Sequence, residues 1–158
     1  MQKHDVRIVE LEPLRVARFH GFGEEPENIA WQALEAWAEP KGLLDYTKAH
    51  RIFGFNNPNP SPGSPNYGYE FWITVTPEET AGEDVEIVAF PGGLYAVARC
   101  EIRGDAYEVI GDTWKQLVAW REQSTYRPAN HQWLEEHVHV SDVGNAFDLD
   151  LYLPIAES

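Results

Sequence analysis

The sequence predicts an α+β fold made of two similar βαββ halves, and three observations lead to that prediction. Alternating apolar and polar residues mark several strands, whereas apolar residues at helical spacing mark two main helices. Clusters of proline, glycine and asparagine separate these elements. The order strand, helix, strand, strand occurs twice along the chain. We therefore expect a single domain over residues 1–158, with pseudo-symmetric halves at about 5–80 and 83–158.

The first half begins with an apolar, β-branched stretch that predicts a strand bent at Glu12 and Pro13. Pro26 suits the first turn of the helix that follows, and Pro40 and Gly42 are stop signals at its end. A segment rich in proline and asparagine over residues 56–66 predicts a loop. The expected elements are a strand over 6–22, a helix over 24–41 and strands over 52–55 and 67–75.

The strand expected over residues 67–75 has two distinct faces. Phe71, Ile73 and Val75 share one side, which is the natural core face because all three are apolar. Glu70 and Trp72 share the other side with Thr74. This strand therefore presents a carboxylate and an indole away from its core.

The second half repeats the same order of elements. Leu14-Arg15-Val16-Ala17-Arg18 resembles Leu94-Tyr95-Ala96-Val97-Ala98-Arg99, and each expected helix carries two tryptophans six residues apart. The expected elements are strands over 85–90 and 93–102, a helix over 106–122, and strands over 132–140 and 147–153.

Each half has too few elements to bury both faces of its sheet alone. Joining the two halves would pair their sheets into a central antiparallel sheet, with a groove at the pseudo-twofold axis. Clefts of this kind favour ligands because walls converge from two sides. We expect the functional site in that groove.

The charge balance narrows the function classes. The chain has 12 Lys and Arg against 26 Asp and Glu, a formal net charge of −14. Nucleic-acid binding depends on neutralising phosphates with basic side chains, so no direct nucleic-acid partner is expected. The same field attracts cationic ligands. A solvated acidic surface would account for the charge equally well.

The location and redox context follow from what the sequence lacks. No apolar run approaches the length of a membrane span, so no membrane partner is expected. The first residues lack a signal-peptide core, which predicts a cytoplasmic protein. Cys100 is the single cysteine, lies in a predicted strand and is interpreted as a small buried apolar residue.

A family resemblance is carried by residues 14–21, 69–75 and 91–97 and by the helix that runs into Thr113 and Trp114. These segments resemble the GyrI-like family, the effector-binding domain also found at the C-termini of AraC-type and MerR-type regulators. The resemblance covers nearly the whole chain, and its motifs are diffuse. It implies a duplicated βαββ fold with a central ligand groove. No DNA-binding helix-turn-helix precedes the domain, so a stand-alone member is expected.

The resemblance also implies a glutamate that meets cationic ligands among aromatic side chains. Glu70, in Tyr69-Glu70-Phe71, resembles the glutamate of the family's Tyr-Glu strand. Glu135 resembles the glutamate of the apolar-Glu-x-Tyr motif, although His137 stands where tyrosine is usual. Indole faces attract cations by about 0.5–2 kcal/mol each. The candidate ligand-binding residues are Glu70, Trp72, Trp133, Glu135 and Tyr95.

Weaker candidates and simpler interpretations stay beside these residues. Asp148, Asp150 and Tyr152 would line the matching face of the second half. All of these side chains could instead form solvated outer strand faces with scattered aromatics.

Metal and cofactor signals are weak. His131, His137 and His139 lie near Glu135 and Glu136, but no His-Glu-x-x-His motif, cysteine cluster or well-spaced third ligand accompanies them. No metal, nucleotide or other cofactor is therefore expected.

Three function classes remain open. The leading prediction is a module that binds aromatic or cationic small molecules. Some GyrI-like proteins resemble hydrolases of cyclopropane-bearing genotoxins, in which case Glu135 or Glu70 would act as general base on water. Others are implied to bind and inhibit DNA gyrase, and an acidic surface suits contact with a DNA-binding enzyme. The fold alone does not decide among these classes.

Overall fold

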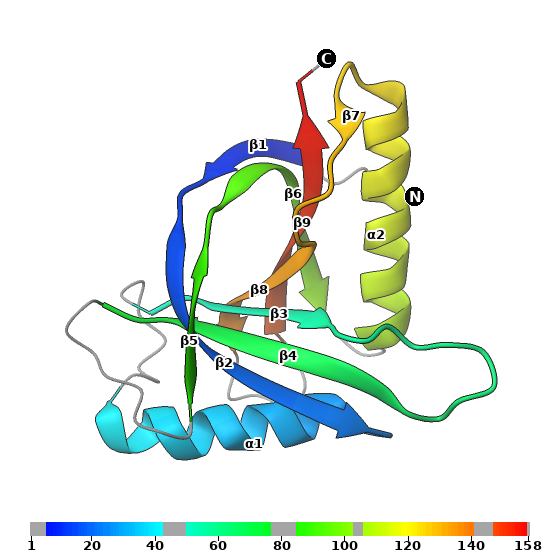
Figure 1. Cartoon of the computed structure of the whole chain (residues 1–158). Coiled ribbons are helices and arrows are strands. Elements are labelled where there is room, and N and C mark those ends of the chain that lie inside the picture. Colours follow the sequence, from blue (N-terminus) through cyan, green and yellow to red (C-terminus); the bar gives the residue numbers. More distant parts are fainter. Residues whose placement is uncertain (1–5, 43–49, 77–84, 103–105, 141–146, 158) are drawn as a thin grey trace. The chain divides into compact units, whose positions relative to one another are not determined.

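In the computed structural model, which describes residues 6–42, 50–76, 85–102, 106–140 and 147–157, the chain divides into two compact units (Figure 1). The middle unit comprises Leu14–Phe90, and the terminal unit comprises Met1–Pro13 together with Pro91–Ser158. Each unit contains antiparallel strands and one main α-helix. The predicted α+β class with two main helices is thereby confirmed.

The middle unit has an antiparallel sheet with strand order β3-β4-β2-β5. Its helix α1 lies along β2 and β4 on one face of that sheet (Figure 1). The elements are β2 (Leu14–Gly23), α1 (Pro26–Ala38), the 3-10 helix η1 (Glu39–Lys41), β3 (Ile52–Asn56), β4 (Tyr67–Thr74) and β5 (Glu86–Phe90).

Helix α1 forms and ends for local reasons that the sequence contains. Pro26 occupies its first turn, where a missing N–H costs nothing. Ala30, Leu34 and Ala38 recur every four residues and are fully buried, so they form the stripe that faces the sheet. Gly42 follows η1 with a left-handed φ of 71°, a conformation that favours glycine.

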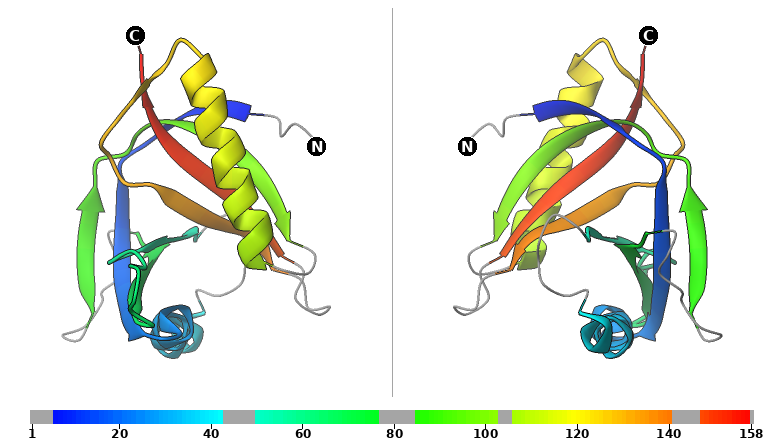
Figure 2. Two further views of the ribbon diagram at one scale, coloured as in Figure 1. Left: turned by 90° about the vertical axis from the view of Figure 1, so that its right-hand side faces the viewer. Right: turned by 90° about the vertical axis from the view of Figure 1, so that its left-hand side faces the viewer.

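The terminal unit has an antiparallel sheet with strand order β1-β6-β9-β8, and β7 pairs with the far end of β9. Helix α2 lies across β6 and β9 (Figure 2). None of the described helices is long and apolar enough to cross a membrane. The elements are β1 (Val6–Leu11), β6 (Gly93–Ile102), α2 (Ala106–Gln123), β7 (Arg127–Pro128), β8 (Leu134–Val140) and β9 (Phe147–Ala156).

In both units, one face of the sheet packs on the helix and the other face carries polar and aromatic side chains. On β4, Phe71 and Ile73 lie in the α1 core, so the predicted core face is confirmed. On β9, Leu149, Leu151 and Leu153 lie in the α2 core. The alternating residues of both strands therefore point away from the helices.

The strand expected over residues 6–22 is wrong in one respect, because it is two strands. Glu12 and Pro13 separate β1 from β2, since proline cannot donate a ladder hydrogen bond. β1 pairs with β6 in the terminal unit, whereas β2 pairs with β4 and β5 in the middle unit. The boundaries of the compact units therefore lie after Pro13 and before Pro91. They differ from the halves of the sequence repeat, which were expected at about 5–80 and 83–158.

Candidate functional site

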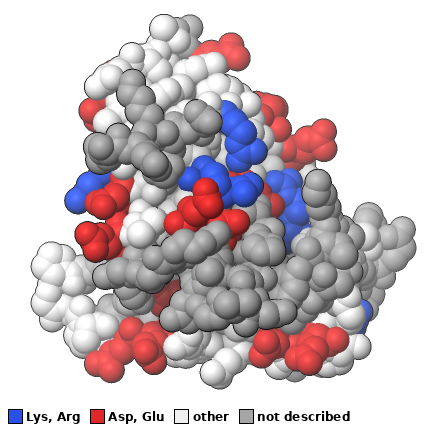
Figure 3. Space-filling model, turned by 180° about the vertical axis from the view of Figure 1, so that it is seen from behind, with Lys and Arg blue, Asp and Glu red and all other residues white. Residues whose placement is uncertain are grey.

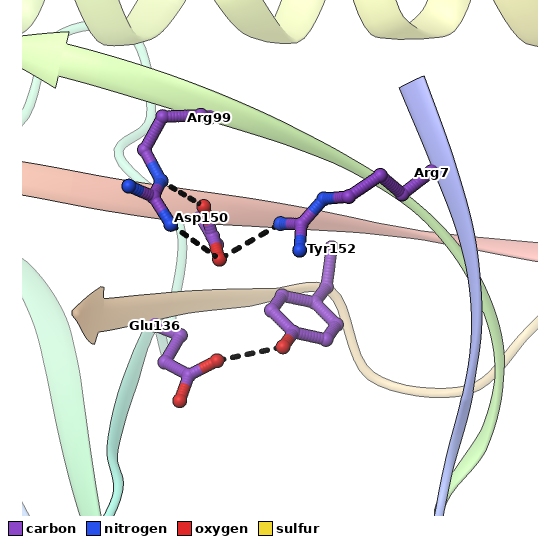
Figure 4. A network of polar contacts seen from close by, with 5 residues as sticks. All are labelled: Arg7, Arg99, Glu136, Asp150 and Tyr152. Carbon is purple, nitrogen blue, oxygen red and sulfur yellow. Dashed lines mark hydrogen bonds and ion pairs between the residues drawn. The ribbon is translucent and has the colours of Figure 1, made fainter. Parts of the chain in front are cut away.

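The sheet face of the terminal unit that points away from α2 gathers charged and hydroxyl side chains (Figure 4). Asp150 on β9 lies directly opposite Arg99 on β6 and Glu136 on β8. Cross-strand partners share a face, so three strands bring these groups together. The cluster consists of Arg7, Arg99, Glu136, Asp150 and Tyr152.

Asp150 is held by two arginines. Arg99 Nε donates to Oδ1 at 2.5 Å and Arg7 Nη2 donates to Oδ2 at 2.9 Å. The Asp150 side chain is only 5% exposed, whereas Arg7 and Arg99 are about half exposed. The hydrogen bond to Asp150 raises the pKa of Arg99 above its ordinary value. The two guanidinium groups thus offset the cost of burying this carboxylate.

Glu136 is the second buried carboxylate of the cluster, at 7% exposure. The hydroxyl of Tyr152 donates to Glu136 Oε1 at 2.6 Å, and both groups are buried. The two side chains come from neighbouring strands and point toward each other (Figure 4). A buried carboxylate with a phenol beside it can meet a cationic or hydrogen-bonding ligand group.

Tyr95, a predicted ligand contact, lies on this same face of β6. Its ring meets the Tyr152 ring edge-on at 5.3 Å, and its hydroxyl donates to the Gln132 carbonyl oxygen at 2.5 Å. Burial raises the pKa of Tyr95 well above its ordinary value, so the phenol stays neutral. Tyr95 is fully buried, and its ring packs against that of Tyr152.

The middle unit has a related arrangement on the face away from α1. Glu70 Oε2 accepts hydrogen bonds from Trp72 Nε1 at 2.7 Å and contacts Arg18 Nε at 2.8 Å. Asn57 Nδ2 donates to Glu70 Oε1 at 3.2 Å. Glu70 and Trp72 are both buried, so the structure brings together these two predicted residues as a bonded pair.

Trp133 and Glu135 lie on the side of the sheet that faces α2. Glu135 is opposite Leu151, which packs in the α2 core. Trp114 of α2 donates from Nε1 to Glu135 Oε2 at 3.3 Å, and its ring lies 5.2 Å from that of Trp133. Trp133 and Glu135 therefore both contact helix α2, whereas Tyr95 and Glu136 lie on the opposite face of the sheet.

An open depression of about 310 Å³ lies along the surface of α2. Trp114 contributes to it, so it adjoins the Trp133 and Glu135 pair. The depression is lined by Trp114, Lys115, Val118, Ala119 and Glu122.

Three arginines of the described residues lie beside buried carboxylates. Arg7, Arg18 and Arg99 each contact a buried carboxylate. On the face shown in Figure 3, blue basic atoms likewise lie directly against red acidic atoms. The arginines therefore neutralise internal charge locally.

Sequence reasoning placed Glu135 among the candidates and left out Glu136. In a strand, Trp133 and Glu135 point to one face, and Leu134 and Glu136 point to the other. Each face therefore has one apolar residue and one glutamate, so the sequence alone does not show which face is buried against the helix. A usable signal was present for the arginines. Arg18 and Arg99 end the two similar stretches of the repeat, and both face carboxylates.

The metal question concerns histidines on β8 and just before it. His131 Nε2 donates to the Leu94 carbonyl oxygen at 2.7 Å, and burial lowers the pKa of His137 to about 4. The side chain of His139 lies outside the described residues. Within the described part of the chain, no group of three His, Cys, Asp or Glu side chains could hold a metal ion.

Cys100 faces the α2 core and is fully buried, in agreement with its interpretation as an apolar residue. Burial raises its thiol pKa, and a hydrogen bond from Thr113 at 3.5 Å acts against that rise. Its thiol is therefore poorly placed for chemistry.

Comparison with known proteins gives a family and a fold. The sequence model of the family described as "Cass2: Integron-associated effector binding protein" matches residues 7–155. No curated protein matches the chain. The C-terminal domain of EcmrR has 11% sequence identity and a TM-score of 0.72, with 99% of this chain and 100% of that chain covered.

Two further structures have related folds. A hydrolase from Listeria innocua has 15% identity and a TM-score of 0.66, with 99% and 94% of the two chains covered. SAV2435 bound to tetraphenylphosphonium has 12% identity and a TM-score of 0.54, with 96% and 94% covered. Identities this low show a shared fold alone.

EcmrR has also been observed in a complex with DNA. In that structure the similarity has a TM-score of 0.71 at 11% identity and covers all of this chain but only 59% of the EcmrR chain. The predicted exclusion of nucleic acid therefore has no support from the comparisons, since a relative of this fold belongs to a DNA-bound protein.

Proposed function

Because the chain belongs to the integron-associated effector-binding protein family, we propose that it binds a small organic effector at the sheet face that bears Glu136. The resemblance to GyrI-like effector-binding domains is confirmed by this membership. Small-molecule binding is the general activity of such a domain. The identity of the ligand and the residues that contact it are the proposal.

One observation carries the proposal. Glu136 and Asp150 are buried side by side on a sheet face, and Tyr152 donates to Glu136. Carboxylates are rarely fully buried unless they are paired, because each one loses its hydration. Asp150 is ion-paired with two arginines. We assign Glu136 and the Tyr152 phenol to the ligand because they place a buried carboxylate and a hydroxyl in contact on this face.

The ligand class follows from charge and shape. The net charge of −14 favours cationic molecules, and the rings of Tyr95 and Tyr152 favour aromatic ones. SAV2435, a protein of similar fold, is bound to tetraphenylphosphonium, which is both. Glu70, Trp72 and Tyr95 stay candidate contacts on faces away from the helices. Trp133 and Glu135 would require a ligand that also reaches α2.

Titration calorimetry with tetraphenylphosphonium and with neutral triphenylphosphine oxide tests the proposal. The native chain should bind the cation saturably. Glu136→Gln should weaken the cation about tenfold, the value of one charge-assisted contact, and leave the neutral probe within twofold. Tyr152→Phe should lower the affinity for both probes by less than the tenfold loss expected for the cation in Glu136→Gln.

The matched control is Glu35→Gln, which removes the same charge from the exposed surface of α1. Equal losses in Glu136→Gln and Glu35→Gln would mean that only the overall field attracts the cation. Unchanged cation affinity in Glu136→Gln would remove Glu136 from the site.

Hydrolysis is a second candidate, favoured by the carboxylate and phenol in contact at 2.6 Å and by the fold shared with the Listeria innocua hydrolase. Glu136 would act as general base on water toward a strained ring such as a cyclopropane. Glu70 is less suited because Arg18 and Trp72 both contact its Oε2 and Asn57 contacts its Oε1. Turnover that is lost in Glu136→Gln but kept in Glu135→Gln would favour this candidate.

Inhibition of gyrase stays a prediction of the family resemblance. A pull-down with gyrase, unaffected by Glu136→Gln, would assign that activity to another surface. A role in transcriptional regulation belongs to the same proposal, because the fold is shared with a DNA-bound regulator of which it covers only part.

A further inference from the structure

The carboxylate of Glu70 in the middle unit is enclosed by groups of its own unit. Its side chain is 4% exposed, and its oxygens contact Arg18, Trp72 and Asn57. Arg18 is the cation among them, at 2.8 Å, and its side chain is 33% exposed. One end of the ion pair is therefore buried, while the other end reaches the surface.

Aromatic rings lie on the same sheet face as this carboxylate. The Trp72 ring meets the Phe55 ring edge-on at 4.9 Å and the Phe90 ring at 5.2 Å. Phe55 is the cross-strand partner of Glu70, so carboxylate and rings share one sheet face. A carboxylate among aromatic rings is the composition that receives an organic cation.

We propose that Arg18 fills this place as an internal cation, so that the middle unit rejects free organic cations that Glu70 would otherwise bind. Arg18 lies opposite Trp72 on the neighbouring strand and reaches Glu70 two residues along. A tethered group acts at a high effective concentration, so a free cation must displace it at a cost in affinity. Arg18 thereby keeps free cations from Glu70 in the middle unit.

The pKa of Arg18 is raised, first by its hydrogen bond with Glu70, in agreement with a firmly held cation. Glu86 lies 3.9 Å from Nη1 of Arg18, but it is 61% exposed and adds little. Glu70 is thus the group that retains Arg18. The effect of Arg18 on ligand selectivity rests on the proposed function and deepens it. The placement of Arg18 against Glu70 does not depend on that function.

Chemical rescue of Arg18→Ala in the full chain tests the occupancy. The probe is ethylguanidinium, which replaces the missing guanidinium, and N-ethylurea is its neutral match. Arg18→Ala should bind ethylguanidinium at least about tenfold more tightly than the native chain does, as one charge-assisted contact predicts. Its melting temperature should rise with ethylguanidinium and not with N-ethylurea.

Two further variants localise the effect. The double variant Arg18→Ala/Glu70→Gln should lose the rescue, because the carboxylate that holds the probe is gone. Arg15→Ala is the matched control, since Arg15 lies on the same strand and donates to the carbonyl oxygen of Thr76. It should show no gain in ethylguanidinium binding.

Several outcomes would overturn the proposal. Equal ethylguanidinium affinity in the native chain and in Arg18→Ala would mean that Arg18 blocks nothing. If Arg18→Ala folds only with ethylguanidinium present, the proposal is supported. If Arg18→Ala does not fold even with ethylguanidinium present, Arg18 is required for packing and the proposal fails. That conclusion holds whether or not Arg18→Ala/Glu70→Gln folds. Absence of effector binding at Glu136 would refute the proposed function and leave these results unchanged.

Discussion

Replacing Asp150 by Asn should destabilise the terminal unit strongly, and the contacts of Asp150 set the size of the effect. Its carboxylate accepts from Arg99 at 2.5 and 3.5 Å and from Arg7 at 2.9 Å. Removing one partner of a buried ion pair costs about 3–5 kcal/mol when the other charge is left buried. Here both arginines are about half exposed and can be hydrated instead. We therefore expect the free energy of unfolding to fall by about 2–4 kcal/mol.

Urea unfolding followed by tryptophan fluorescence measures this change, and a double-mutant cycle assigns it. The coupling of Asp150→Asn with Arg99→Met should exceed its coupling with Arg7→Met, because Arg99 makes two contacts and Arg7 makes one. Asp112→Asn on the exposed surface of α2 is the control and should change stability by less than about 0.5 kcal/mol. A loss in Asp150→Asn no larger than the control, or equal couplings for the two arginines, would refute the reasoning.

Three further predictions concern packing, pH and the candidate site. Gly21→Ala should destabilise by about 1–3 kcal/mol or more in thermal unfolding, because its Cβ would collide with the backbone of Pro26 and Ala30; Gly111→Ala on open helix surface should instead stabilise by about 0.5–1 kcal/mol. Burial lowers the pKa of His137 from 6.5 to about 4, so the imidazole stays neutral in the folded state while the unfolded chain takes up a proton below pH 6.5. The stability that His137 contributes above pH 6.5 should therefore be lost as the pH falls toward 4. Over that window, the free energy of unfolding of the native chain, measured with urea, should fall by up to about 3 kcal/mol more than that of His137→Gln. Tyr152→Phe should lower the free energy of unfolding by about 1.5–3 kcal/mol in the same assay, because buried Glu136 loses a charge-assisted hydrogen bond, and an unchanged value would contradict that bond.

Local periodicity was enough to predict most elements and their faces. On β4, apolar Phe71 and Ile73 alternate with Glu70 and Trp72, and the two sets occupy opposite faces in the structure. Helix α1 follows equally from its buried stripe and its Pro26 start. Such patterns depend on neighbouring residues alone, which is why the sequence contains them.

Strand pairing and strand phase could not be predicted in the same way. β1 pairs with β6, which lies more than eighty residues later, and only tertiary packing selects that partner. The phase of β8 was ambiguous because Glu135 and Glu136 are adjacent. Their faces became clear only when Leu151 and Asp150 were found opposite them. The proposed Glu136 therefore lies on the other side of the sheet from the predicted Glu135.

The two units differ where their chemistry matters. In the middle unit, Glu70 lies opposite Phe55 on β3 and His20 on β2. In the terminal unit, Asp150 lies opposite Glu136 on β8 and Arg99 on β6. Glu70 and Asp150 each form an ion pair with an arginine of their own unit: Glu70 with Arg18, and Asp150 with Arg99. Among the described residues, this face of the terminal unit therefore buries two carboxylates, Asp150 and Glu136, whereas the corresponding face of the middle unit buries Glu70. The middle unit thus has an aromatic face with an ion-paired carboxylate, and the terminal unit has a second carboxylate, Glu136, which we propose for the ligand.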